Sequence, residues 1–197
     1  MGEKEPVKYN LGKILRFKAK YLRQLLFEGK KTTIRKGIVT PKTPAVYLES
    51  DGKIYGEATI KGVRFTKLSE LTDEDALRDG FESKKELVKA LQEIYPELSE
   101  DDWVTIISFS DVTRYSSPVT REALREARRH EKDFARIARL ALAYGLTETF
   151  EEQRILASLQ VTGDVKKTAK ELGISPRYIK LILGKIIKRL KERSLMK

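Results

Sequence analysis

Residues 29–37 read "GKKTTIRKG" and bring four cationic side chains, two threonines and two glycines together within nine positions. The stretch follows an apolar segment with helical spacing. Gly29 is placed to end that helix, because glycine adopts left-handed backbone angles without strain. We therefore expect a cationic, hydroxyl-rich turn. Such a turn serves as an exposed loop, as a cradle for a phosphate group, or as the edge of a catalytic pocket.

The segments around this stretch predict an α+β domain over residues 11–116. Asp51-Gly52 is a strong hairpin signal between two β-rich segments. Thr72 and Ser83 each stand where a side chain caps the start of a helix. The expected strands are "ILRF" (14–17), "TPAVYLES" (43–50), "IYGEATIKGVRFTKL" (54–68) and "DWVTIISFSDVTRY" (102–115), and the expected helices lie at 18–29, 72–80 and 83–98.

The second half of the chain reads as helical throughout. "SSPVT" at 116–120 carries the residues of a break. After it, residues 121–145 predict one long helix, which Gly145 ends, and residues 147–160 predict another. We therefore divide the chain into a first domain at 1–116 and an all-α domain at 117–197.

Composition narrows the class of protein. The 197 residues are 40% hydrophobic, and no apolar run has the length of about 18 residues that a membrane span needs. The N-terminal segment has no apolar signal-peptide core, so we expect a cytoplasmic protein. There is no cysteine, and the one histidine, His130, lies in a polar helical run, so we expect neither a metal nor a cofactor. The many Lys, Arg and Glu residues are typical of heat-adapted proteins.

The charge is concentrated in the second half. The whole chain has a formal net charge of +11, and residues 117–197 hold 19 Lys and Arg against 10 Asp and Glu. Such a basic segment indicates a polyanionic partner, with nucleic acid ahead of an acidic membrane surface.

The clearest motif is "VKKTAKELGISPRYIKLILGKIIKRLKER" at 165–193. We expect a helix over 164–172, a turn at Gly173, and a second helix that Ser175 caps and Pro176 begins. Over about 164–190 this segment resembles the helix-turn-helix family, and the small, glycine and apolar positions of that pattern are occupied by Ala169, Gly173, Ile179 and Ile182.

The helix-turn-helix resemblance implies that the second helix enters the major groove of DNA by its N-terminal part. It would expose Leu181 and the nucleic-acid-binding residues Arg177, Tyr178, Lys180, Lys185, Lys188 and Arg189. The alternative is a helical packing or dimerisation module. An apolar stripe on the same helix also leaves a homodimer open, and it comprises Ile182, Leu183, Ile186, Ile187 and Leu190.

The first half has a family resemblance of its own. The order of its elements, together with "GKKTTIR", "LRDGF" (77–81) and "YP" (95–96), resembles the ASCH family of PUA-like β-barrels. The resemblance implies a cleft that contacts RNA or a nucleoside-like ligand through Lys30, Lys31, Thr33, Arg35 and Lys36. The spacing departs from the family's GxKxxExR pattern. Gly29 to Arg35 is one residue short, so either Lys30 or Lys31 is the motif lysine, and Thr33 stands in the glutamate position.

Some small members of this family are similar to amidohydrolases that act on N-acylated cytidines. The matching residues here are Lys30 or Lys31, Thr33 and Asp79. A desolvated lysine can activate a threonine hydroxyl, and a carboxylate can pass a proton to the leaving amine. Asp79 is one methylene shorter than the family's glutamate, and a misplacement of about 1 Å can cost about 100-fold in rate.

The fold expected is therefore a small PUA-like β-barrel followed by a helix-turn-helix domain. The function favoured is binding of RNA or DNA, because a basic tail adds little to a hydrolase of small molecules. The alternatives are the amidohydrolase, an RNA-processing nuclease, and a transcription factor that responds to a ligand in the cleft.

Overall fold

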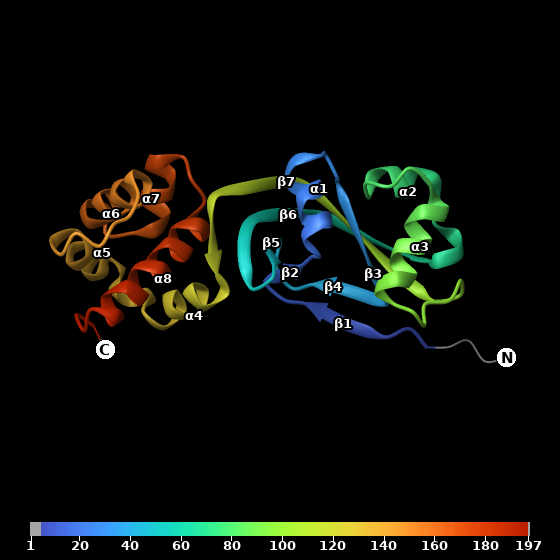
Figure 1. Cartoon of the computed structure of the whole chain (residues 1–197), viewed down its shortest axis with the longest axis horizontal. Coiled ribbons are helices and arrows are strands. Elements are labelled where there is room, and N and C mark those ends of the chain that lie inside the picture. Colours follow the sequence, from blue (N-terminus) through green and yellow to red (C-terminus); the bar gives the residue numbers. More distant parts are fainter. Residues whose placement is uncertain (1–4, 197) are drawn as a thin grey trace. The chain divides into compact units, whose positions relative to one another are not determined.

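The computed structural model describes residues 5–196 and has an α+β fold made of two compact units (Figure 1). The first, which we call the sheet unit, comprises residues 5–51 and 55–116. The second, the helical unit, comprises residues 52–54 and 117–196. No helix of the described residues is both long enough and apolar enough to cross a membrane. The assignment of an ASCH domain to 1–116 and a helix-turn-helix domain to 117–197 stays a prediction at this point.

The strands form two sheets. A five-stranded sheet has the order β2-β5-β6-β7-β3, with β2 parallel to β5 and β3 antiparallel to β7. A two-stranded parallel sheet joins β1 to β4. The strands are β1 (Lys8–Leu11), β2 (Ile14–Arg16), β3 (Thr32–Lys36), β4 (Ile38–Pro41), β5 (Ala45–Ser50), β6 (Lys53–Lys67) and β7 (Trp103–Thr120).

The hairpin between β5 and β6 turns where the sequence predicts. Asp51 and Gly52 have φ values of 50° and 76°, the positive angles that a two-residue hairpin turn requires. β7 continues through the segment 116–120 to Thr120, so the strand does not end at the expected break, although the two compact units divide between residues 116 and 117. Tyr115 and Val119 are buried while Ser116 and Pro118 are exposed, so the alternation of a strand persists and the proline occupies an outward position.

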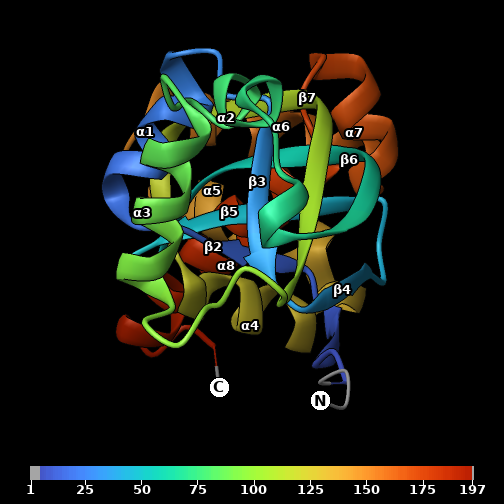
Figure 2. The same cartoon turned by 90° about the vertical axis from the view of Figure 1, so that its right-hand side faces the viewer.

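Three α-helices accompany the sheets: α1 (Ala19–Phe27), α2 (Asp73–Arg78) and α3 (Lys84–Ile94). A short 3-10 helix, Leu68–Glu70, precedes α2. Both predicted caps are confirmed, since Thr72 accepts a hydrogen bond from the Asp75 N–H and Ser83 accepts one from the Glu86 N–H. Figure 2 shows α1 and α3 on the same side of β3, and this arrangement creates the walls of the site described below.

The helical unit contains α4 (Arg121–Arg129), α5 (Phe134–Ala143), α6 (Phe150–Thr162), α7 (Val165–Leu172) and α8 (Pro176–Glu192). The single helix expected over 121–145 is wrong. His130 leaves the helical region at φ −117° and ψ 21°, and a 3-10 turn, Glu131–Asp133, separates α4 from α5. The break allows Leu124 and Phe134 to be buried on two different helices.

Helix α8 is the core of the helical unit and packs against α4, α5 and α7. Nine of its 17 residues are buried, whereas Lys188 and Glu192 remain exposed, so its apolar face is broad but does not enclose the helix. A Cβ at Gly184 would lie 1.8 Å from the carbonyl oxygen of Ala123, so the backbones of α8 and α4 approach each other closely. The stripe from Ile182 to Leu190 is buried inside this unit and offers no face for a homodimer.

The connection between α7 and α8 has the predicted local structure. Gly173 has a φ of 65°, the Ser175 hydroxyl accepts a hydrogen bond from the Arg177 N–H at 3.1 Å, and Pro176 begins α8. These interactions fix the turn. The DNA-binding role of the segment stays a prediction.

Candidate functional site

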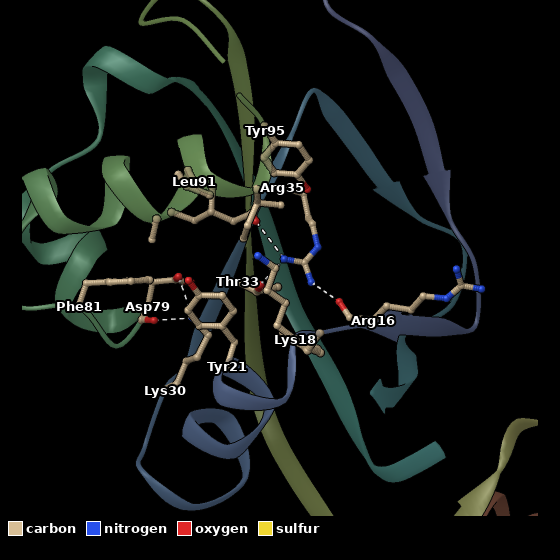
Figure 3. Close-up of a pocket in the computed structure, with 14 residues that line it drawn as sticks. Arg16, Lys18, Tyr21, Lys30, Thr33, Arg35, Asp79, Phe81, Leu91 and Tyr95 are labelled. Carbon is tan, nitrogen blue, oxygen red and sulfur yellow. Dashed lines mark hydrogen bonds and ion pairs between the residues drawn. The ribbon is translucent and has the colours of Figure 1, made fainter. Parts of the chain in front are cut away.

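A cleft of about 280 Å³ opens beside β3 in the sheet unit. Its walls come from β2 and the residues after it, α1, β3, the segment after α2, and α3. We call it the aromatic cleft, and Figure 3 shows the residues around it. It is lined by Arg16, Phe17, Lys18, Tyr21, Lys30, Thr33, Ile34, Arg35, Asp79, Phe81, Ala90, Leu91, Ile94 and Tyr95.

An ion pair between Lys30 and Asp79 forms the inner end of the cleft. The two residues are only 5% and 4% exposed, and Nζ of Lys30 lies 2.7 Å from Oδ2 of Asp79. Lys30 also donates to the backbone carbonyl of Asp79. The hydroxyl of Thr32 donates to Oδ1 of Asp79 at 3.1 Å. Thr32 completes this cluster, although the motif pointed to Thr33.

Burial shifts both members of the pair toward their neutral forms. It lowers the pKa of the Lys30 ammonium below its ordinary value, although the charge of Asp79 opposes this change. Burial likewise raises the pKa of the Asp79 carboxyl, against Lys30 and the hydroxyl of Thr32. A lysine whose pKa is lowered and a carboxyl group whose pKa is raised can exchange a proton with a bound molecule.

Arg35 forms the second polar group of the cleft. Its Nη1 donates to the hydroxyl of Thr33 at 2.8 Å, and its Nη2 donates to the backbone carbonyl of Arg16 at 2.8 Å. The guanidinium lies 5.0 Å from the centre of the Phe17 ring. These contacts orient the planar cation, and they lie on the opposite side of the cleft from the Lys30–Asp79 pair in Figure 3.

Aromatic rings separate the two polar groups. The ring centres of Tyr21 and Phe81 are 5.9 Å apart, and Nζ of Lys30 lies 5.6 Å and 5.5 Å from them. An apolar cavity with a few fixed polar groups suits a planar, polar-edged ligand. Sequence reasoning missed these rings and Tyr95. Tyr21 lies on the apolar stripe of α1, which predicts only core packing, and Phe81 directly follows the Asp79-Gly80 pair.

The structure separates the residues of the "GKKTTIRKG" stretch. Lys30, Thr33 and Arg35 meet Asp79 in the cleft, and Lys30 is the buried lysine at this site. The expectation of a turn is wrong from Thr32 onward, because residues 32–36 form β3 and pair with β7. The β-branched Thr-Thr-Ile sequence explains the strand. Lys36 lies outside the aromatic cleft and pairs with Glu97 at 2.6 Å.

The prediction of an exposed second helix is wrong for two of its residues. Tyr178 is 4% exposed and donates its hydroxyl to Glu151 at 2.8 Å, and Leu181 is fully buried. Both belong to the apolar surface of α8 that fills the core. Lys180 pairs with Glu131, and Lys188 pairs with Glu122 at 3.1 Å.

Two further cations of α8, Lys185 and Arg189, hold a buried carboxylate. Lys185 and Arg189 donate to the two oxygens of Glu152, at 2.9 Å and 2.6 Å respectively. Burial of Glu152 opposes its ionisation, but Arg189, the Glu148 N–H and Lys185 outweigh that effect and lower its pKa to about 2. These two side chains therefore stabilise the helical unit from within.

Across residues 5–196, no group of three or more His, Cys, Asp and Glu side chains gathers to hold a metal ion.

A sequence model of the ASCH domain family matches residues 13–113. Among solved structures, the ASCH protein of Zymomonas mobilis is 17% identical with a TM-score of 0.45, over 59% of this chain and 78% of that chain. The N-terminal domain of McrB from Staphylothermus marinus is 14% identical with a TM-score of 0.35, over 60% of this chain and 77% of that chain. No curated protein matches the sequence.

The Lys30–Asp79 pair predicts a variant whose stability rises more steeply with alkaline pH than the parent's, because Asp79 holds the pKa of Lys30 up against the effect of burial. Asp79→Asn leaves the buried Lys30 charge without its partner, which should lower the free energy of unfolding by about 3–5 kcal/mol at neutral pH. In the unfolded chain Lys30 titrates near 10.5, whereas its folded pKa is lower. Between those values the unfolded state binds more protons, so the variant should regain stability as the pH rises toward 10.5.

Urea unfolding at neutral and alkaline pH measures this effect. Glu97→Gln is the matched control, since it removes the carboxylate of an exposed pair, and it should leave the pH profile of the parent unchanged. A profile of Asp79→Asn that runs parallel to the parent's would contradict the role given to Asp79.

Proposed function

We propose that this chain, which belongs to the ASCH domain family, binds RNA by holding a nucleobase in the aromatic cleft. The observation that carries the proposal is the pairing of stacking surfaces with fixed polar groups. Tyr21 and Phe81 present rings to one cleft, and the guanidinium of Arg35, oriented by its hydrogen bonds to protein oxygens, lines the same cleft. RNA-binding proteins read unstacked bases by this combination of aromatic stacking and hydrogen bonds to the base edge.

The two sheets of the sheet unit are, in this proposal, parts of a PUA-like β-barrel that carries the cleft on its surface. The segment that connects β2 to β3 through α1 supports this assignment, because it places Phe17, Tyr21 and Lys30 beside β3, where they line the cleft. The cleft is formed within the sheet unit alone, so RNA binding there does not depend on the helical unit.

For the helical unit we propose a helix-turn-helix that contacts the sugar-phosphate backbone of a duplex. Support comes from the face of α7, where Lys166, Lys167 and Lys170 are exposed. No carboxylate partner of these three lysines is found in the described chain. Lysines of this kind contact phosphates and position a protein without reading sequence. A chain that binds RNA in the cleft and a duplex on α7 would act as a regulatory protein.

A metal-independent amidohydrolase is the second candidate. It is favoured by the lowered pKa of Lys30 and the raised pKa of Asp79 in the cleft that also contains Thr33. In this candidate the Thr33 hydroxyl attacks the acyl carbon of an N-acylated cytidine, and Lys30 takes its proton and passes it through Asp79 to the departing amine. Water then hydrolyses the acyl-Thr33 ester, which releases the carboxylate and restores the hydroxyl. The hydroxyl of Thr33 accepts its hydrogen bond from Arg35, which leaves its own proton available to a base.

The first prediction concerns RNA binding in the cleft. Arg35→Gln should raise the Kd for a fluorescein-labelled, mixed-sequence RNA octamer by about tenfold or more, because a charge-assisted hydrogen bond is worth about 1.5–3 kcal/mol. Lys36→Gln is the control, since it removes the same charge from the adjacent residue outside the cleft. Fluorescence anisotropy gives both values, and circular dichroism checks the fold.

Photocrosslinking provides a second measurement that needs no variant. RNA that contains 4-thiouridine should crosslink to peptides with Tyr21, Phe81 or Tyr95. Crosslinks that fall entirely elsewhere, or equal Kd values for the two variants, would refute the cleft as the RNA site.

The second prediction concerns α7. Lys166→Gln with Lys170→Gln should weaken binding of a short DNA duplex and reduce the slope of log K against log salt by about 0.9 for each phosphate that is no longer neutralised. The control is Lys188→Gln with Lys191→Gln, which removes two α8 cations already paired with Glu122 and Glu126. Identical slopes for the two double variants would exclude α7 as the duplex surface.

The third prediction tests catalysis. If the second candidate holds, the parent releases acetate from N4-acetylcytidine, Thr33→Val abolishes the release by removing the nucleophile, and Thr33→Ser retains part of it. Chromatography of cytidine and acetate follows the reaction. A parent that releases no acetate removes this candidate and leaves RNA binding unaffected.

A further inference from the structure

A second cavity, of about 440 Å³, lies beside the aromatic cleft in the sheet unit. We call it the basic cavity. The two cavities are neighbours because Lys30 lines both of them. The basic cavity is lined by Lys30, Lys31, Lys61, Arg78, Phe109, Ser110 and Val112. RNA binding as proposed above makes no use of this cavity.

Cations dominate the basic cavity. Lys31 precedes β3, Lys61 lies on β6, and Arg78 ends α2, so three separate segments each bring one exposed cation to the same place. Within residues 5–196, none of these three side chains pairs with a carboxylate. Two other lining residues do contact carboxylates: Lys30 pairs with Asp79, and the hydroxyl of Ser110 donates to Asp111 at 3.1 Å.

Backbone hydrogen bonds fix this arrangement. The N–H of Lys31 donates to the carbonyl of Arg78 at 2.9 Å, and the N–H of Phe109 donates to the carbonyl of Lys31 at 3.0 Å. The start of β3, the end of α2 and β7 are therefore held together at the cavity. The positive charges of Lys31, Lys61 and Arg78 repel one another at the cavity. A bound anion attracts all three and offsets this repulsion.

We infer that the basic cavity is a phosphate subsite for the nucleotide whose base occupies the aromatic cleft. This inference rests on the proposed function and specifies its ligand. The ligand is a phosphorylated nucleotide, either within an RNA chain or free. A nucleoside without phosphate would occupy the aromatic cleft alone and make no contact in the basic cavity. Arg78 suits a phosphate because its guanidinium donates two parallel hydrogen bonds, and Lys31 and Lys61 add positive charge.

The chain also offers a matched pair of variants for the test. Lys61→Gln with Arg78→Gln removes two cations of the basic cavity. Lys85→Gln with Lys89→Gln removes two exposed cations of α3 that line neither cavity. Both double variants lower the net charge by the same amount. Any difference between them therefore reports the position of the charges.

Anisotropy with the labelled RNA octamer, measured over a range of KCl concentrations, supplies the readout. We expect the cavity variant to raise the Kd about tenfold or more and to reduce the salt slope by about 0.7, the value for one phosphate of a single strand that is no longer neutralised. The α3 variant should stay close to the parent in both. Competition by a mixture of nucleoside 5′-monophosphates, compared with the free nucleosides, shows whether a free nucleotide also uses the subsite.

The outcomes separate this inference from the proposed function. If Arg35→Gln weakens the octamer while the cavity variant matches the α3 variant, the aromatic cleft stands and the phosphate subsite is refuted. If the cavity variant weakens the octamer while Arg35→Gln does not, the base site is refuted, and with it the pairing of the two cavities. A parent that binds no octamer refutes both.

Discussion

The buried ion pair between Lys30 and Asp79 is the constraint on which the candidate site depends. It joins the segment before β3 to the end of α2, and Thr32 adds a hydrogen bond to the same carboxylate. Because both charges are removed from water, the pair tolerates neither the loss of one partner nor a large displacement. The pair closes the inner end of the aromatic cleft. By fixing Lys30, it also leaves the next residue, Lys31, to face the basic cavity on the other side.

Net charge and available charge differ between the two units. The helical half of the chain is the more basic in sequence. However, Lys185 and Arg189 surround Glu152, and Lys188 pairs with Glu122. The sheet unit is closer to neutral, yet it gathers unpaired cations at one cavity. A count of charges along a sequence therefore includes cations that the fold uses internally, such as Lys185 and Arg189. Exposed cations without a carboxylate partner among the described residues, such as Lys170 of α7 and Lys61 of the sheet unit, are the ones available to a polyanion.

Much of the local structure could be predicted because short-range chemistry determines it. The Asp51-Gly52 turn, the Thr72 and Ser83 caps, and the turn at Gly173 all depend on the conformational preferences of a few adjacent residues. The errors arose where distant partners decide. Residues 32–36 form a strand because β7 pairs with them, and α4 ends at His130 because two separate helix faces are buried. The burial of the broad apolar face of α8 was readable from its many Ile and Leu residues, but the helix-turn-helix resemblance favoured an exposed helix.

The candidate site was predicted in part. The motif located Lys30, Thr33 and Arg35, and the "LRDGF" segment located Asp79, whereas the aromatic rings required the fold to bring α1 and the segment after α2 together. The central position of α8 has a consequence for synthesis. The ribosome makes α4, α5 and α7 before α8, so the surfaces that these helices pack against α8 stay without that partner until the stretch ending at Leu190 has emerged. During synthesis the helical unit therefore exposes hydrophobic surface until α8 is complete. Chaperones can bind that surface in this interval and prevent aggregation.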